Sequence, residues 1–110
     1  MQKLSLQAMA RELLGRADGA SGGRAAETVV GGHERVLRQT VIALVKDSAL
    51  GDHENPGEAS VYVLAGRVAL SAGGHKWEGR TGDLLIVPDS THSLAALEDS
   101  VVLLTVAKQQ

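Results

Sequence analysis

The spacing of apolar residues changes once along the chain, and this change constrains the fold more than any other feature. Before the glycine-rich segment 19–23, apolar side chains recur at helical spacing; after it, they recur at every second position, as in strands. A chain of 110 residues has the usual size of one domain. We therefore expect an N-terminal helix and linker over residues 1–23 and an all-β domain over residues 24–110.

The N-terminal segment predicts a short amphipathic helix over residues 5–17. Its apolar side chains fall on one helical face: Leu6, Met9, Leu13 and Leu14. Ser5 precedes them and can accept a hydrogen bond from an unpaired backbone N–H of the first turn. The apolar face either covers the β domain or binds a partner.

The rest of the chain predicts a series of short strands with no helix between them. Such a series is typical of a sandwich or a closed barrel. The expected strands are Thr28–Val30, Val36–Lys46, Ser60–Leu64, Arg67–Ser71, His75–Glu78, Asp83–Val87, His92–Leu97 and Val101–Ala107.

The last of these strands, Val101–Ala107, is apolar on both faces. A strand with one face in water would alternate between apolar and polar residues. Its second face is therefore covered, either by the N-terminal helix or by another subunit. We expect a homodimer.

Composition excludes several classes of protein. The net charge of −2 gives no general attraction to phosphate backbones, and a chain with no Phe, one Tyr and one Trp lacks stacking platforms for nucleic acid. With no cysteine, disulfides and thiolate zinc sites are excluded. No apolar run approaches the roughly 20 residues of a membrane helix. We expect a cytoplasmic protein that binds neither nucleic acid nor membrane.

Two linked motifs carry a family resemblance. Residues 53–66, from His53 to Gly66, resemble the first signature of the cupin superfamily, which is H-x-H, three residues, E, six residues and G. Residues 82–92, from Gly82 to His92, resemble the second signature, which is G, five residues and P-x-G-x-x-H. The resemblance implies a double-stranded β-helix, the RmlC-like jelly-roll barrel, which is often dimeric in this family.

The resemblance implies a metal site whose ligands are only partly present. His53 and His92 match the first and last histidines of the signatures, while Asn55 stands at the second histidine and Ala59 at the glutamate. Strand alternation places Ala59 inside the barrel and Glu58 outside, unless a bulge turns Glu58 inward. The candidate ligands are therefore His53, Asn55, Glu58 and His92.

This donor set favours a partly occupied transition metal (zinc, nickel, iron or copper) over magnesium or calcium, because its two imidazoles are ligands that transition metals prefer. The leading interpretation is a cupin that binds a small molecule or a weakly held divalent metal in its barrel. A metal-dependent enzyme of the oxygenase or isomerase type and a ligand-sensing interaction protein are the alternatives. No catalytic residue and no site for an organic cofactor can be assigned.

Other candidates have simpler interpretations. His33 and His75 lie near predicted turns, where solvated side chains are the rule. Trp77 is expected at a rim or a subunit contact, or else as a substrate platform. The acidic residues around His53 form either a solvated turn or a mouth that attracts cations: Asp52, Glu54 and Glu58.

Overall fold

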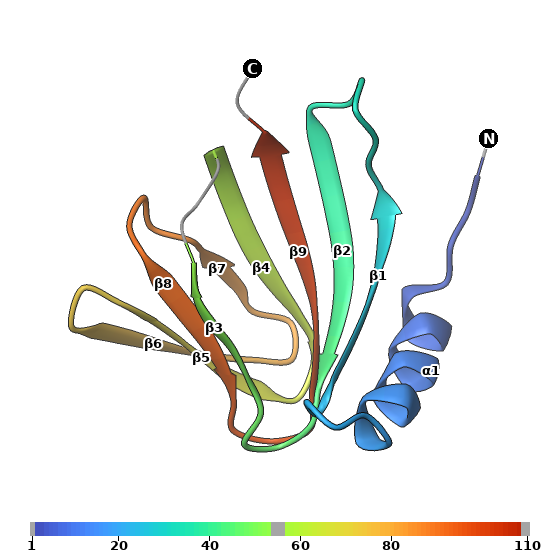
Figure 1. Ribbon diagram of the computed structural model, residues 1–110, viewed down its shortest axis with the longest axis horizontal. Helices are drawn as coiled ribbons and strands as arrows, with labels where there is room; N and C mark the ends of the chain where they lie inside the picture. Colours follow the sequence, from blue (N-terminus) through green and yellow to red (C-terminus); the bar gives the residue numbers. More distant parts are fainter. Residues whose placement is uncertain (1, 54–56, 109–110) are drawn as a thin grey trace.

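The structure is a computed structural model that describes residues 2–53 and 57–108, with His53 described by its backbone. It has two antiparallel sheets that face each other, with one helix outside (Figure 1). The larger sheet has the order β1 (Arg24–Val30), β2 (Leu37–Leu44), β9 (Ser100–Lys108), β4 (Gly57–Ala65) and β7 (Leu84–Ile86). The smaller sheet has the order β3 (Ala49–His53), β8 (His92–Ala96), β5 (Arg67–Ala72) and β6 (His75–Arg80). The expected all-β barrel with an N-terminal helix is confirmed.

The barrel interior is filled by one face of each sheet. On β4, Val61 and Val63 are buried while Tyr62 between them is exposed on the outer face. The same alternation on the other strands gives one apolar interior cluster, because neighbouring side chains of a strand point to opposite faces. The buried members of the cluster are Ile42, Leu44, Val61, Val63, Val68, Leu70, Val87, Leu94, Ala96 and Val102.

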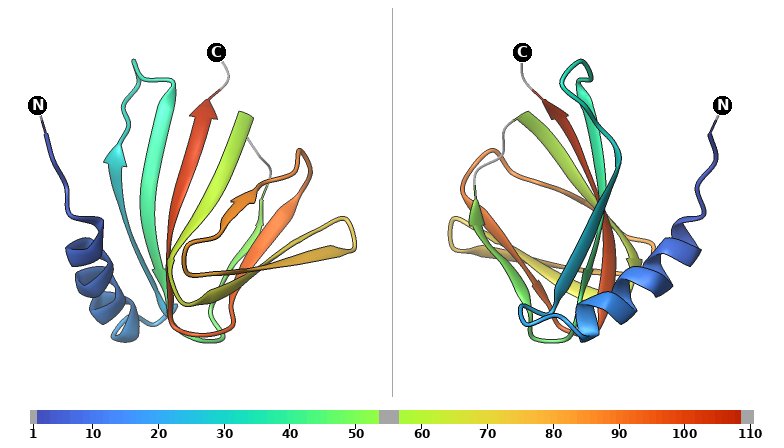
Figure 2. Two further views of the ribbon diagram at one scale, coloured as in Figure 1. Left: turned by 180° about the vertical axis from the view of Figure 1, so that it is seen from behind. Right: turned by 45° about the vertical axis from the view of Figure 1, so that its right-hand side comes forward.

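The helix α1 (Leu6–Asp18) packs on the outer face of the larger sheet, as both views of Figure 2 show. Its Leu13 and Ala17 are fully buried against Val41, Ala43 and Val101. The expected Ser5 cap is confirmed, because the backbone N–H of Ala8 donates to the Ser5 hydroxyl at 3.2 Å. The second face of the C-terminal strand is thus covered in part by the helix.

Two expectations about the strands were wrong. β3 was not predicted, and β1 begins four residues earlier than its expected start at Thr28. β1 reaches back to Arg24 because Gly23, with φ of 68°, turns the chain directly from the helix into the sheet. β3 forms because it lies beside β8, although its own sequence does not alternate.

The turn between β4 and β5 is fixed by Gly66, whose φ of 92° favours glycine. A side chain at this position would also collide with the carbonyl oxygen of Asp99 and with the hydroxyl of Ser100. This turn carries the chain from β4 in the larger sheet to β5 in the smaller sheet. Among the described residues, no helix has the length and apolarity needed to span a membrane.

Candidate functional site

His92 is the one titratable side chain that is buried in the described part of the chain. Its Nδ1 lies 2.9 Å from the carbonyl oxygen of Ser90, and a carbonyl can only accept. Nδ1 therefore carries a proton, so Nε2 is the ring nitrogen that can coordinate a metal. A metal-binding histidine is commonly oriented in this way by a backbone carbonyl. His92 has the orientation that a ligand requires.

The backbone of His53, at the end of β3, is the register partner of His92 on β8. Residues that face each other in an antiparallel pair share one face of the sheet. The sheet register therefore brings the two predicted histidine positions together. The predicted ligand Asn55 lies outside the described residues, as does Glu54.

Ala59 and Glu58 fall on opposite faces of β4. Ala59 is partly buried and packs against the interior cluster, while Glu58 is exposed. The registers of Glu58 with Ala107 and of Ala59 with Val106 are continuous, so no bulge turns Glu58 inward within β4. Metal ligation by Glu58 stays a prediction, and its side chain lies on the outer face of the sheet.

The described residues fit a divalent ion only in part. Outside the segment 54–56, they contain no group of three or more His, Cys, Asp or Glu side chains that could hold a metal. The interior cavity beside His92 has a volume of about 20 Å³. Its other lining residues are aliphatic: Ile42, Leu50, Val61, Leu70, Val87, Leu94, Val102 and Leu104. Since a water molecule needs roughly 10–15 Å³, this cavity is only of water size.

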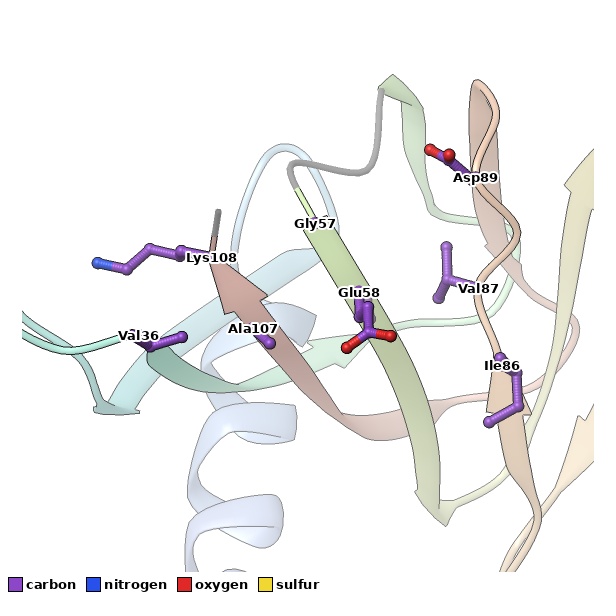
Figure 3. Close-up of a pocket in the computed structure, with 9 residues that line it drawn as sticks. Val36, Gly57, Glu58, Ile86, Val87, Asp89, Ala107 and Lys108 are labelled. Atoms are coloured by element: carbon purple, nitrogen blue, oxygen red, sulfur yellow. The ribbon is translucent and has the colours of Figure 1, made fainter. Parts of the chain in front are cut away.

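A much larger pocket opens at the rim of the barrel, where β4, β7 and β9 meet. Its volume is about 700 Å³, which lies within the range of about 300–1,000 Å³ typical of small-molecule sites. The walls, shown in Figure 3, are formed by Val36, Gly57, Glu58, Ala59, Ile86, Val87, Asp89, Ala107 and Lys108. We call this space the rim pocket.

Val87 connects the two spaces, because its side chain lines both the rim pocket and the cavity beside His92. Its backbone N–H donates to the carbonyl oxygen of Ala59 at 3.0 Å, and this bond holds the segment after β7 against β4. Val87 is buried. It therefore forms a partition between an open, partly polar pocket and the buried imidazole.

Sequence reasoning did not identify Val36, Asp89 or Lys108 as pocket residues. Asp89 follows Pro88 inside the second motif, which was a usable signal. Val36 and Lys108 carried no signal, because nothing in the linear sequence shows that β9 lies between β2 and β4.

The other candidates lie outside the rim pocket. His33 is exposed, and His75 and Trp77 form an exposed ring pair on β6 with centroids 5.8 Å apart. His75 and Asp52 line a separate open depression beside the β5–β6 turn. Neither of these residues nor Trp77 contributes to the cavity beside His92.

Comparisons with known proteins place this geometry in a fold family. A conserved protein of unknown function from Streptococcus pyogenes is 27% identical, with a TM-score of 0.74 over 83% of this chain and 79% of that chain. A cupin superfamily protein from Desulfitobacterium hafniense is 15% identical, with a TM-score of 0.72 over 78% of each chain.

An RmlC-like cupin from Shewanella frigidimarina is 20% identical, with a TM-score of 0.70 over 82% of this chain and 80% of that chain. No family model matches the chain, and no curated protein sequence matches it. The structural matches agree with the two motifs and with the two-sheet topology. The chain has the fold of a small cupin domain.

Proposed function

We propose that the protein is a binding cupin that holds a small molecule in the rim pocket. The observation that carries the proposal is the contrast between the two spaces, about 700 Å³ at the rim and about 20 Å³ inside the barrel. A molecule of metabolite size can enter the first and not the second. The proposed ligand position is therefore the rim pocket, on the other side of Val87 from His92.

A binding role fits the described residues better than a catalytic one. An enzyme requires an acid, a base or a nucleophile that reaches the bound substrate. The carboxylates that line the rim pocket, Glu58 and Asp89, are exposed to solvent, whereas catalytic acids and bases are commonly tuned by burial. In the described part of the chain the buried polar side chains are His92 and Ser100. Ser100 lies at the Gly66 turn, and Val87 separates His92 from the rim pocket.

A weakly held divalent metal at His92 is a second proposal. The support is the orientation of the imidazole by Ser90 and the register of His92 with His53. When bound there, the metal would supply a Lewis acid. His92 would hold it through Nε2, and the Ser90 carbonyl would keep the ring in place.

We also propose that two copies of the chain associate through the part of the larger sheet that α1 leaves uncovered. Outside the helix contact, Tyr62 of β4 and Leu84 of β7 are register partners on this face, and 39% and 58% of their surfaces are exposed. Neighbouring apolar side chains exposed in this way are typical of an interaction site. A homodimer would remove them from water.

The binding proposal is tested by titrating isotope-labelled protein with a fragment library that contains neutral, cationic and anionic members. Proton–nitrogen NMR should show shifts of the backbone amides of Gly57, Glu58 and Asp89 with some of the fragments. The variant Ala107→Trp should weaken these shifts, because the indole fills the pocket.

The matched control is Ala95→Trp, which adds the same ring to the outer face of the smaller sheet. Fragments that bind equally well to the wild type and to Ala107→Trp, or that shift only amides far from the rim, would refute the proposed pocket.

A further inference from the structure

Two carboxylates lie at the rim pocket, and neither has an ion pair or a side-chain hydrogen bond with another described residue. Glu58 projects from β4 and Asp89 from the segment after β7, on different walls of the pocket (Figure 3). Every ion pair found among residues 2–53 and 57–108 involves Arg16 or Arg67, and neither carboxylate takes part. No side-chain hydrogen bond within those residues reaches them either. Both negative charges are available to a ligand.

The one cationic residue of the pocket wall is directed elsewhere. The ammonium group of Lys108 donates to the carbonyl oxygen of Gly32 at 2.8 Å. Figure 3 shows its side chain extending away from Glu58 and Asp89. The charge that faces the pocket is therefore negative.

The remaining walls are apolar. Val36, Ile86 and Val87 contribute branched side chains, and Ala59 and Ala107 contribute methyl groups. A hydrated inorganic ion would gain nothing from these walls, whereas a hydrocarbon body would lose its contact with water there. The negative charge of the pocket and its apolar walls together favour a ligand with one cationic end and one apolar part.

We infer that the rim pocket takes an organic cation with an apolar body, such as a substituted ammonium or guanidinium compound, which the negative charges of Glu58 and Asp89 attract. The inference rests on the proposed binding function and adds the class of ligand. The apolar body lies against Ile86 and Val87, and the cationic end lies toward the carboxylates.

The test compares three probes of nearly equal shape: benzylammonium, benzyl alcohol and phenylacetate. Each is titrated at millimolar concentration into labelled protein, and the pocket amides are followed by NMR. We expect a Kd for benzylammonium about 5- to 20-fold lower than for benzyl alcohol, since exposed charge pairs contribute modestly. Phenylacetate should bind most weakly. Added salt should reduce the preference, because it screens exposed charges.

The double variant Glu58→Gln, Asp89→Asn should remove the preference for the cation and keep the weak binding of benzyl alcohol. The matched control is Glu12→Gln, Asp18→Asn: it also removes one Glu and one Asp charge, on α1 and outside the pocket, and should leave the preference intact.

Equal Kd values for benzylammonium and benzyl alcohol would overturn the inference and leave the binding function standing. A stronger response to calcium chloride than to benzylammonium would also overturn it, in favour of an inorganic ion. If neither the probes nor the fragment library shifts the pocket amides, the binding function fails as well.

Discussion

The Nδ1–H of His92 and the carbonyl of Ser90, two residues earlier, form a 2.9 Å hydrogen bond that fixes the imidazole from behind. A histidine held in this way can coordinate through Nε2. The affinity of the site for a metal therefore depends on the other donors. At the position of the family glutamate stands Ala59, whose methyl group packs against the interior cluster.

We predict that protein purified without added metal carries well under one equivalent, and that Ala59→Glu increases the zinc content. The reason is that a carboxylate supplies the anionic donor that a methyl group lacks. Metal analysis measures the content. Zinc should also raise the melting temperature of the variant, since a ligand of the native state stabilises it.

Ser60→Glu is the matched control for this prediction, because it adds the same side chain one residue later on the outer face. It should leave the zinc content unchanged, and His92→Ala should abolish the gain of Ala59→Glu. Tight zinc binding by the wild type, unchanged by Ala59→Glu, would show that other donors complete the site.

Sedimentation should give about twice the chain mass, because a dimer covers the exposed side chains of Tyr62 on β4 and Leu84 on β7. The variant Tyr62→Asp, Leu84→Asp places two charges at this contact and should yield folded monomers. A wild-type monomer at micromolar concentration would contradict the proposed dimer.

The helix should contribute to stability without being needed for the barrel. Leu13 is 1% exposed between α1 and the larger sheet, and a buried Leu→Ala change costs about 2–5 kcal/mol. Leu13→Ala should therefore lower the free energy of unfolding by an amount in this range, as measured by urea denaturation. Deletion of residues 1–20 should do the same and leave the circular dichroism of a β protein. If the free energy of unfolding does not change, the helix does not stabilise the barrel and is available to bind a partner.

Ser100 should be costly to replace although it lies far from the rim pocket. Its hydroxyl accepts from the backbone N–H of Arg67 at 3.0 Å and lies within 3.1 Å of the Arg67 carbonyl oxygen. Ser100→Ala leaves these backbone groups without this partner, which costs about 1–3 kcal/mol. Denaturation measures the loss, and the half-buried Ser93 offers a serine control with a smaller expected effect.

The sequence was sufficient to predict the helix and those strands whose own residues show a regular spacing of apolar side chains. The helix begins one residue after its expected start, because Ser5 is its cap, and the strand after Arg67 was placed within one residue. β3 could not be found, because Gly51 and Asp52 interrupt its pattern and its pairing with β8 holds it in the sheet. The pattern of residues within a segment indicates only the conformation which that segment itself prefers. β3 could not be predicted in this way, because it depends on pairing with β8, about 40 residues away.

The candidate site was predictable only where the motifs lie. His92 was identified from the second signature, and alternation placed Ala59 correctly against the interior cluster. The rim pocket was not foreseen, because Glu58, Asp89 and Lys108 belong to segments that meet only after the sheet has formed.

The position of β9 in the larger sheet has a consequence for the order of folding. β9 is the last strand along the described chain, yet it lies between β2 and β4. The ribosome adds roughly 5–20 residues per second, so β9 is synthesised several seconds after β2 and β4, and these two strands stay unpaired on that side until then. During that time their edges are open to other nascent chains. Chaperones that shield β strands during translation should therefore raise the yield of folded protein, and slow synthesis should lower it.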